Sequence, residues 1–156
     1  MKNTENKPTI YFDLDGTVYD LYNQPDWLER ITTLADPTAY ANEDATMVDM
    51  VALQDTLLAL VDAGYSIGVV SWLAMDASAE YDKAVRAVKR DWVKKFLPMA
   101  TEVHIVRYGT PKHRVINNRE NAIIVDDNAE VRESWSRGLT IDATKDILEP
   151  LRELLN

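Results

Sequence analysis

The chain has 156 residues, and a hydrophobic content of 46% with 28% charged residues predicts one soluble globular domain that spans residues 1–156. The net charge of −9 argues against non-specific binding to nucleic acid or to anionic membranes, and the absence of cysteine excludes disulfides and thiolate metal sites. No apolar run is long enough to span a membrane, and the polar N-terminal residues lack the apolar core of a secretion signal, so we expect a cytoplasmic protein.

Short apolar runs alternate with segments of helical period along the chain. The expected strands are residues 10–14, 66–71, 103–106 and 122–125, with a weaker one at 139–141. The expected helices are residues 50–63, 81–96, 129–137 and 146–155. Alternating strands and helices predict an α/β fold with parallel pairing, and the nearly continuous apolar strands predict a sheet covered on both faces.

Polar side chains occur where the expected strands end. Ligands bind outside the carboxyl ends of the strands in such sheets, so these side chains should gather at one rim. They comprise two acids after the first strand, a hydroxyl at the end of the second, an ammonium after the third and two acids after the fourth: Asp13, Asp15, Ser71, Lys112, Asp126 and Asp127.

This set of side chains suits phosphoryl transfer from a monoester. An aspartate can attack phosphorus, and a second carboxyl group can protonate the leaving oxygen and later activate water. A lysine and a hydroxyl can hold the other phosphate oxygens. A cation is needed as well, because two carboxylates about 4 Å apart repel by roughly 4 kcal/mol at an effective dielectric of about 20. Carboxylates and phosphate oxygens are the ligands that Mg²⁺ prefers.

The four motifs, in this order, resemble the haloacid dehalogenase (HAD) superfamily. The matching segments are FDLDGTVYD at 12–20, VVSW at 69–72, YGTPK at 108–112 and VDDN at 125–128. They look like the small stand-alone HAD-like proteins of phages and gut bacteria, which implies a bacterial cell or a phage-infected host. The resemblance covers nearly the whole chain, from Thr9 to the C-terminal helix. It implies a Rossmann-like, doubly wound parallel sheet with a small helical cap inserted after the first strand.

The resemblance also implies a role for each matching residue. Asp13 would be the nucleophile and Asp15 the general acid and base, while Ser71 and Lys112 would bind phosphate. The implied Mg²⁺ ligands are Asp13, Asp126 and Asp127, together with the backbone carbonyl of Asp15.

Each of these residues also has a purely structural interpretation. Asp13 and Asp15 could cap a loop, Ser71 could merely end a strand, and Lys112 could be a solvated charge. Either Asp127 or Asn128 could cap the helix that starts near residue 129. Lys83, soon after the second strand, is the rival to Lys112 as the phosphate-binding lysine.

The expected helix at 81–96 is unusually basic for this acidic chain. Its six basic residues outnumber two acids: Lys83, Arg86, Lys89, Arg90, Lys94 and Lys95 against Asp82 and Asp91. The favoured interpretation is a solvated outer face opposite an apolar stripe of Val85, Val88 and Trp92. The alternative is attraction of an anionic substrate or partner.

Residues 20–49 form a longer connection than a crossover needs, and we interpret them as the cap-like insertion. Trp27, Ile31 and Leu34 have the spacing of one short helix, which Pro37 would end. The acidic composition of the insertion disfavours polyanions and favours a small monoester. We expect Tyr19, Trp27 and Trp72 to line the substrate pocket, beside Tyr22. Trp72 could stack on a nucleobase or simply pack against the insertion.

Together these observations predict a magnesium-dependent phosphomonoester hydrolase that acts through an aspartyl-phosphate. A small metabolite such as a (deoxy)nucleoside 5′-monophosphate is the best substrate hypothesis. Two alternatives stay open at this point. One is a polynucleotide end-phosphatase, and the other is a HAD-like protein that binds a phosphorylated ligand or partner without turnover. The oligomeric state is not indicated by the sequence.

Overall fold

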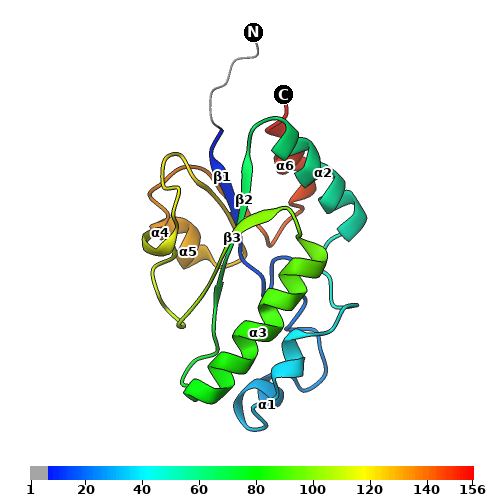
Figure 1. The fold of residues 1–156 in the computed structure, drawn as a ribbon, viewed down its shortest axis with the longest axis vertical. Helices are drawn as coiled ribbons and strands as arrows, with labels where there is room; N and C mark the ends of the chain where they lie inside the picture. Colours follow the sequence, from blue (N-terminus) through cyan, green and yellow to red (C-terminus); the bar gives the residue numbers. More distant parts are fainter. Residues whose placement is uncertain (1–6) are drawn as a thin grey trace.

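A five-stranded sheet organises residues 7–156, which a computed structural model describes (Figure 1). All neighbouring strands pair in parallel, in the order β3-β2-β1-β4-β5. The strands are β1 (Thr9–Phe12), β2 (Ser66–Trp72), β3 (Ala100–Val106), β4 (Ile123–Asp126) and β5 (Thr140–Asp142). The prediction of an α/β fold with a doubly wound parallel sheet is confirmed, and each expected strand exists within a few residues of its predicted bounds.

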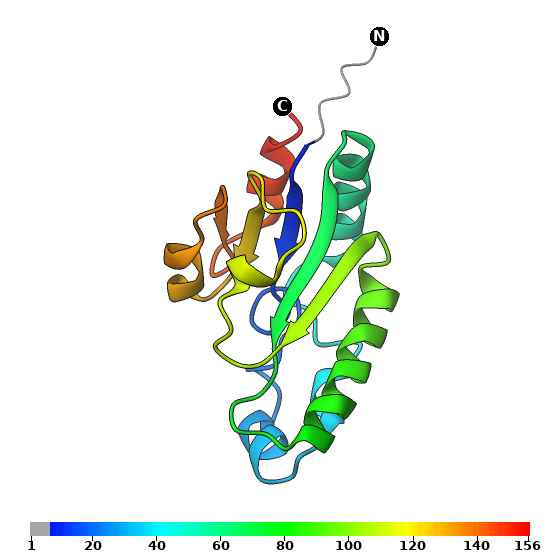
Figure 2. The same cartoon turned by 60° about the vertical axis from the view of Figure 1, so that its left-hand side comes forward.

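Helices cover both faces of the sheet, and Figure 2 shows the two layers on either side of it. One face carries α2 (Met50–Asp62), α3 (Ala79–Phe96) and α6 (Leu148–Glu153), and the other carries the short helices α4 (Lys112–Val115) and α5 (Ala129–Ser134). Two further short elements, α1 (Trp27–Thr32) and the 3₁₀ helix η1 (Pro37–Tyr40), lie in the insertion after β1.

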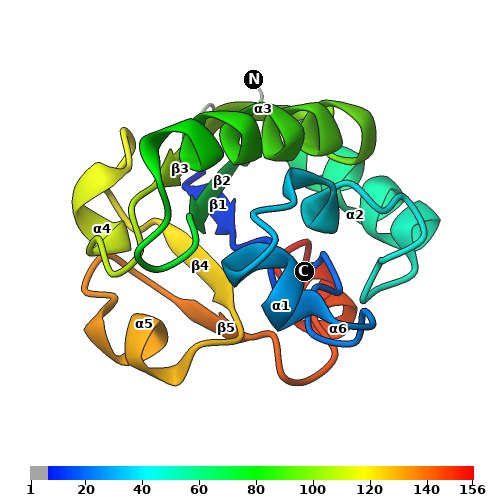
Figure 3. The same ribbon diagram turned by 90° about the horizontal axis from the view of Figure 1, so that it is seen from below.

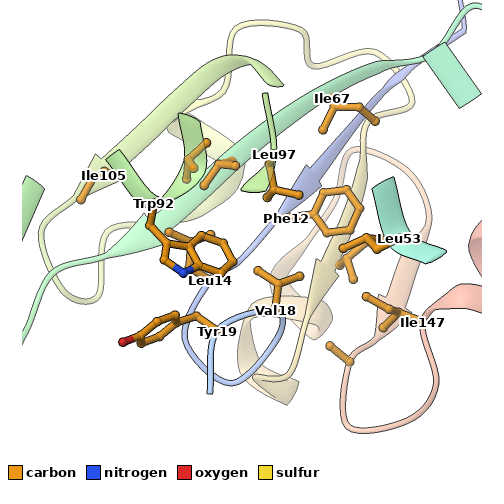
Figure 4. Close-up of a cluster of buried hydrophobic side chains, with 14 of the residues drawn as sticks. Phe12, Leu14, Val18, Tyr19, Leu53, Ile67, Trp92, Leu97, Ile105 and Ile147 are labelled. Atoms are coloured by element: carbon orange, nitrogen blue, oxygen red, sulfur yellow. The ribbon is translucent and has the colours of Figure 1, made fainter. Parts of the chain in front are cut away.

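The alternation of side chains along the strands divides the core in two. Ile10 and Phe12 point into the larger cluster, which α2 and α3 complete with residues such as Leu53 and Trp92 (Figure 4). Tyr11 points to the opposite face, into a smaller cluster with residues of β4, α4 and α5. Burying each large apolar side chain contributes about 1.5–3 kcal/mol, so the larger cluster supplies most of the stability and fixes the position of β1.

The insertion differs from the prediction in detail. Its helix ends at Thr32, and Leu34 lies outside it with 59% of its surface exposed. Pro37 does not end this helix but begins η1, where the Asp36 side chain accepts a hydrogen bond from the Thr38 backbone. The prediction was wrong because proline is favoured in the first turn of a helix, where its missing N–H costs nothing.

Helix α5 is shorter than predicted, ending at Ser134, because Trp135 leaves the helical path and becomes buried in the smaller core cluster. Its indole N–H donates to the Ala122 carbonyl at 2.9 Å. This contact fixes the chain just before β5.

The insertion lies below the carboxyl ends of the strands in the view of Figure 1, and Figure 3 shows it from that side. Two tyrosines fasten its η1 part. Tyr19 donates a hydrogen bond to the Ala39 carbonyl at 2.6 Å, and Tyr81 of α3 donates to the Asp36 carbonyl at 3.1 Å. Within residues 7–156, no helix combines the length and apolar character needed to cross a bilayer.

Candidate active site

The loop after β1 presents two aspartates at the carboxyl rim of the sheet. The Asp13 backbone N–H continues the sheet by donating to the Val125 carbonyl of β4 at 3.0 Å. The loop then turns at Gly16, which has a φ of +82°, and a Cβ at this position would collide with the Asp127 carboxylate. Glycine is therefore required here both by the backbone conformation and by the close approach of the acid.

Three carboxylates meet at this rim. Asp13, Asp126 and Asp127 each offer one oxygen, and these oxygens all lie within 4.8 Å of one another. Burial first, and then the charge of Asp13, raise the pKa of Asp126 to about 6 and that of Asp127 to about 8. Protons are thus held where like charges converge, and a hard divalent cation such as Mg²⁺ fits the same three oxygen donors.

Lys112 joins two of these acids. Its Nζ lies 2.9 Å from Asp13 Oδ1 and 2.7 Å from Asp126 Oδ2, and its side chain is almost fully buried. Burial opposes the ammonium charge, but the two carboxylates outweigh it and raise the pKa of Lys112. The rival Lys83 is exposed on α3. Lys112 is therefore not a solvated charge but the counter-ion of the acid cluster.

The neighbouring residues Asp127 and Asn128 have separate tasks. The Asn128 side chain accepts from the backbone N–H groups of Glu130 and Val131 at 2.9 and 3.3 Å, so Asn128 is the N-cap of α5. The Asp127 carboxylate turns to the acid cluster, where the Thr17 hydroxyl lies 3.4 Å from its Oδ1.

Lys89 of α3 is the residue of this rim that sequence reasoning missed. Its Nζ donates to Asp15 Oδ2, to Ser71 Oγ and to the Trp72 carbonyl, each at 2.8 Å. We counted Lys89 among the charges of a solvated basic helix, but only 1% of its surface is exposed. A signal was present in the spacing, because position 89 lies within the apolar stripe that contains Val85 and Trp92.

Asp15 is held apart from the other acids. Burial raises the pKa of the Asp15 carboxyl group, and the positive charge of Lys89 opposes this shift. Its Oδ2 is bound to Lys89, whereas its Oδ1 is buried without a hydrogen-bond partner. Asp15 is not one of the three acids whose oxygens converge, and the role of its backbone carbonyl as a metal ligand stays a prediction.

A cavity of about 350 Å³ lies over these residues. Its floor consists of the charged side chains Asp13, Asp15, Lys112, Asp126 and Asp127. Its walls are mainly apolar and aromatic, from the insertion and from the loops after β2 and β3: Leu21, Tyr22, Trp27, Leu28, Ile31, Thr32, Tyr40, Trp72, Leu73, Ala74, Met75 and Tyr108, with Asn128 and Val131 of the α5 region.

The expected pocket aromatics have different positions. Trp27 lines the cavity and meets Tyr22 edge to face, with ring centroids 4.9 Å apart. Trp72 also lines it; its ring centre lies 5.1 Å from both Lys112 Nζ and the Tyr108 ring centre, so this wall residue packs between Lys112 of the floor and the loop after β3. Tyr19 is not a lining residue, because its ring packs against Trp92 in the core.

Comparison with known proteins assigns neither a family nor an activity to this chain. The sequence matches no protein-family model and no curated protein sequence. Among solved structures, the chain is similar to the D,D-heptose 1,7-bisphosphate phosphatase from Burkholderia thailandensis, with 12% identity, 85% of this chain and 75% of that chain covered, and a TM-score of 0.46. It is also similar to the HAD domain of the effector protein Lem4 from Legionella pneumophila, with 15% identity, 98% and 95% covered, and a TM-score of 0.46. These similarities are too distant to assign an activity.

Proposed function

We propose that this protein is a HAD-type, magnesium-dependent phosphomonoester hydrolase that forms an aspartyl-phosphate on Asp13. The observation that supports this most is the convergence of Asp13, Asp126 and Asp127 on one point, with Lys112 bridging two of them beneath a cavity. A purely structural role would not require four buried or half-buried ionic groups at a strand rim, because burying charge is costly.

The proposed reaction has two displacements. The Asp13 carboxylate attacks phosphorus, the bond from phosphorus to the ester oxygen breaks, and Asp15 gives its proton to that oxygen. Asp15 then takes a proton from water, whose oxygen attacks phosphorus and releases phosphate from Asp13. The first step leaves Asp15 as a carboxylate that can take a proton from water. The second step restores the free Asp13 carboxylate and the protonated Asp15.

The remaining residues of the floor would stabilise charge. Asp13, Asp126 and Asp127 are the residues that would hold Mg²⁺, which supplies positive charge next to the phosphate oxygens when bound. Lys112 pairs with Asp13 and orients it through the 2.9 Å contact at Oδ1. The Ser71 hydroxyl would donate to a phosphate oxygen.

For the substrate, we propose a small monoester such as a (deoxy)nucleoside 5′-monophosphate. The aromatic walls offer stacking surfaces to a flat leaving group. All charged lining residues belong to the floor, and the wall residues carry no cation that could pair with a second phosphate. Residues 20–49 act in this proposal as the cap that supplies much of the wall.

The test is a panel of phosphate esters assayed for phosphate release with and without Mg²⁺. Asp13→Asn should lower turnover by roughly 1,000-fold or more, while Asp62→Asn, an exposed aspartate of α2, should leave it unchanged. Mass spectrometry after acid quenching should find a phosphoryl group on Asp13 in the wild type.

The other two hypotheses predict different results from the same panel. A polynucleotide end-phosphatase would act on oligonucleotide ends, with strong salt dependence. A binding protein without turnover would release no phosphate from any ester and would still bind ligand after Asp13→Asn. Either result would remove the proposed metabolite phosphatase.

A further inference from the structure

We propose that Lys89 is a positioning residue, which holds Asp15 so that Oδ1 exchanges the proton with the substrate and holds Ser71 so that its hydroxyl hydrogen faces phosphate. This inference rests on the proposed phosphatase reaction. It is carried by three contacts of 2.8 Å from Lys89 Nζ, to Asp15 Oδ2, Ser71 Oγ and the Trp72 carbonyl.

The surroundings of Lys89 stabilise its buried ammonium group. It reaches the rim from the middle of α3, between apolar neighbours of the core, and the Tyr40 ring lies 4.6 Å from its Nζ. A buried ammonium is stable only where its charge is paired and its donors are used. The three acceptors match the three N–H donors of a lysine, so none is left over.

Because all three of its N–H donors are used, Lys89 differs from the phosphate-binding groups. Lys89 does not line the cavity, nor does the fully buried Ser71 beside it, and all three donors of Lys89 are already engaged. It therefore acts through Asp15 and Ser71 and does not need to touch the substrate.

The contact with Asp15 distinguishes the two oxygens of that carboxyl group. Oδ2 accepts from the ammonium, so a proton on Oδ2 would face a cation, whereas Oδ1 is buried with no partner. Asp15 lines the cavity, and Oδ1, although shielded from solvent, is its one oxygen without a partner, so we assign the proton exchange with the leaving-group oxygen and later with water to Oδ1.

The contact with Ser71 sets the direction of a hydroxyl. Because Ser71 Oγ accepts from Lys89, its own hydrogen is free to point elsewhere, and the hydroxyl becomes a donor. One lysine thus orients both the proton-transfer group, in the loop after β1, and a phosphate-binding group, on β2.

The test compares two phosphate esters whose leaving groups differ in their need for a proton. p-Nitrophenolate leaves without protonation, while an alkoxide from an alkyl phosphate needs the acid. In Lys89→Met we expect turnover of the alkyl ester to fall by about 100-fold. The burst of p-nitrophenol, which reports only the first displacement, should slow by no more than about 10-fold, through the loss of Ser71 orientation alone, whereas its steady-state hydrolysis should slow further because water attack needs Asp15 as base.

Two comparisons separate this role from a general loss of structure. Lys83→Met, an exposed lysine on the same helix, should behave as wild type with both esters. Combining Lys89→Met with Asp15→Asn should lower turnover of the alkyl ester below that of Asp15→Asn alone only by the smaller factor seen in the p-nitrophenol burst, because both changes remove the same proton transfer and only Lys89→Met also releases Ser71. Lys89→Gln keeps an N–H donor on a side chain one bond shorter and should show the same selective loss in a milder form, with circular dichroism confirming the fold of each variant.

The outcomes are distinct for the two proposals. If the wild type releases no phosphate from either ester with Mg²⁺, the proposed function fails. If the wild type is active but Lys89→Met and Lys89→Gln slow the burst and the alkyl ester equally, or add fully to Asp15→Asn, the role of Lys89 is wrong while the phosphatase stands.

Discussion

The floor and the walls of the cavity are built in different ways. The floor comes mainly from strand ends and the turns after them; its acids are buried or half-buried, and Lys112 hydrogen-bonds to Asp13 and Asp126. The walls come largely from the insertion and two loops, and several of their side chains, such as Leu28 and Met75, are more than half exposed. The difference teaches that the reaction would depend on the sheet, whereas substrate choice would depend on segments that can change without disturbing it.

The largest expected effect is on the floor, from Lys112→Met. We expect turnover to fall by roughly 1,000-fold, because Asp13 loses its oriented counter-ion. The metal-free variant should also be destabilised by about 3–5 kcal/mol, since two buried carboxylates lose their partner. Mg²⁺ should restore part of this stability, as thermal unfolding would show. Full activity in Lys112→Met would contradict the view that the reaction depends on the floor of the cavity.

The second expected effect is a pH dependence of the floor in the absence of metal. The raised pKa values of Asp126, about 6, and Asp127, about 8, mean that the folded protein binds protons that the unfolded chain releases near pH 4. This contribution to stability is full at low pH and is lost as the pH rises through the folded-state values. Unfolding temperature should therefore decline between about pH 5 and pH 8 with EDTA.

Saturating Mg²⁺ should flatten that decline, because the cation replaces the protons and neutralises the same oxygens. Titration calorimetry at pH 7 in buffers of different ionisation enthalpy should detect protons released on Mg²⁺ binding. Metal binding without proton release would place the ion away from these carboxylates.

The third effect is on the walls and is smaller. Trp27→Ala should raise KM for a nucleoside monophosphate by about 10-fold and change kcat by less than about 3-fold, because it removes stacking surface far from the reacting atoms. Leu58→Ala, an exposed position of α2 outside the cavity, is the control. Steady-state kinetics check the result, and a fall in kcat equal to that of Lys112→Met would mean that the walls share in the chemistry.

The smallest effect would come from adding a cation to the walls. Leu28→Arg should improve kcat/KM for a nucleoside 3′,5′-bisphosphate over the monophosphate by up to about 5-fold, since an exposed ion pair contributes about 1 kcal/mol at most. The gain should disappear in high salt. No gain would mean that the second phosphate does not reach this wall.

The positions of the acidic residues at the strand ends were the feature that the sequence predicted best. Asp13 and Asp126 follow uninterrupted apolar runs, and parallel strands bring their carboxyl ends to one rim, so the sequence alone predicts that they meet. The structure places them on the same Lys112 ammonium. Their roles in a reaction stay predictions.

Residues that depend on packing between distant segments could not be placed in the same way. Lys89 looked like a surface charge because its three acceptors come from β2 and the loop after β1, far along the chain. Tyr19 looked like a pocket aromatic, but the fold uses its hydroxyl to hold the insertion at Ala39. Periodicity describes which face of a helix is apolar, and it does not show which polar group that face will meet.

The two tyrosine contacts of η1 have a consequence for access to the cavity. Helix α1 has no buried residue, while η1 is tied to both the first loop and α3. We therefore expect the entrance of the cavity, on the side of Trp27 and Leu28, to open by a local movement of α1 while η1 stays in place. Amide hydrogen exchange should then be faster in α1 than in η1. Substrate would enter and product would leave through this entrance while Lys89 keeps Asp15 and Ser71 oriented.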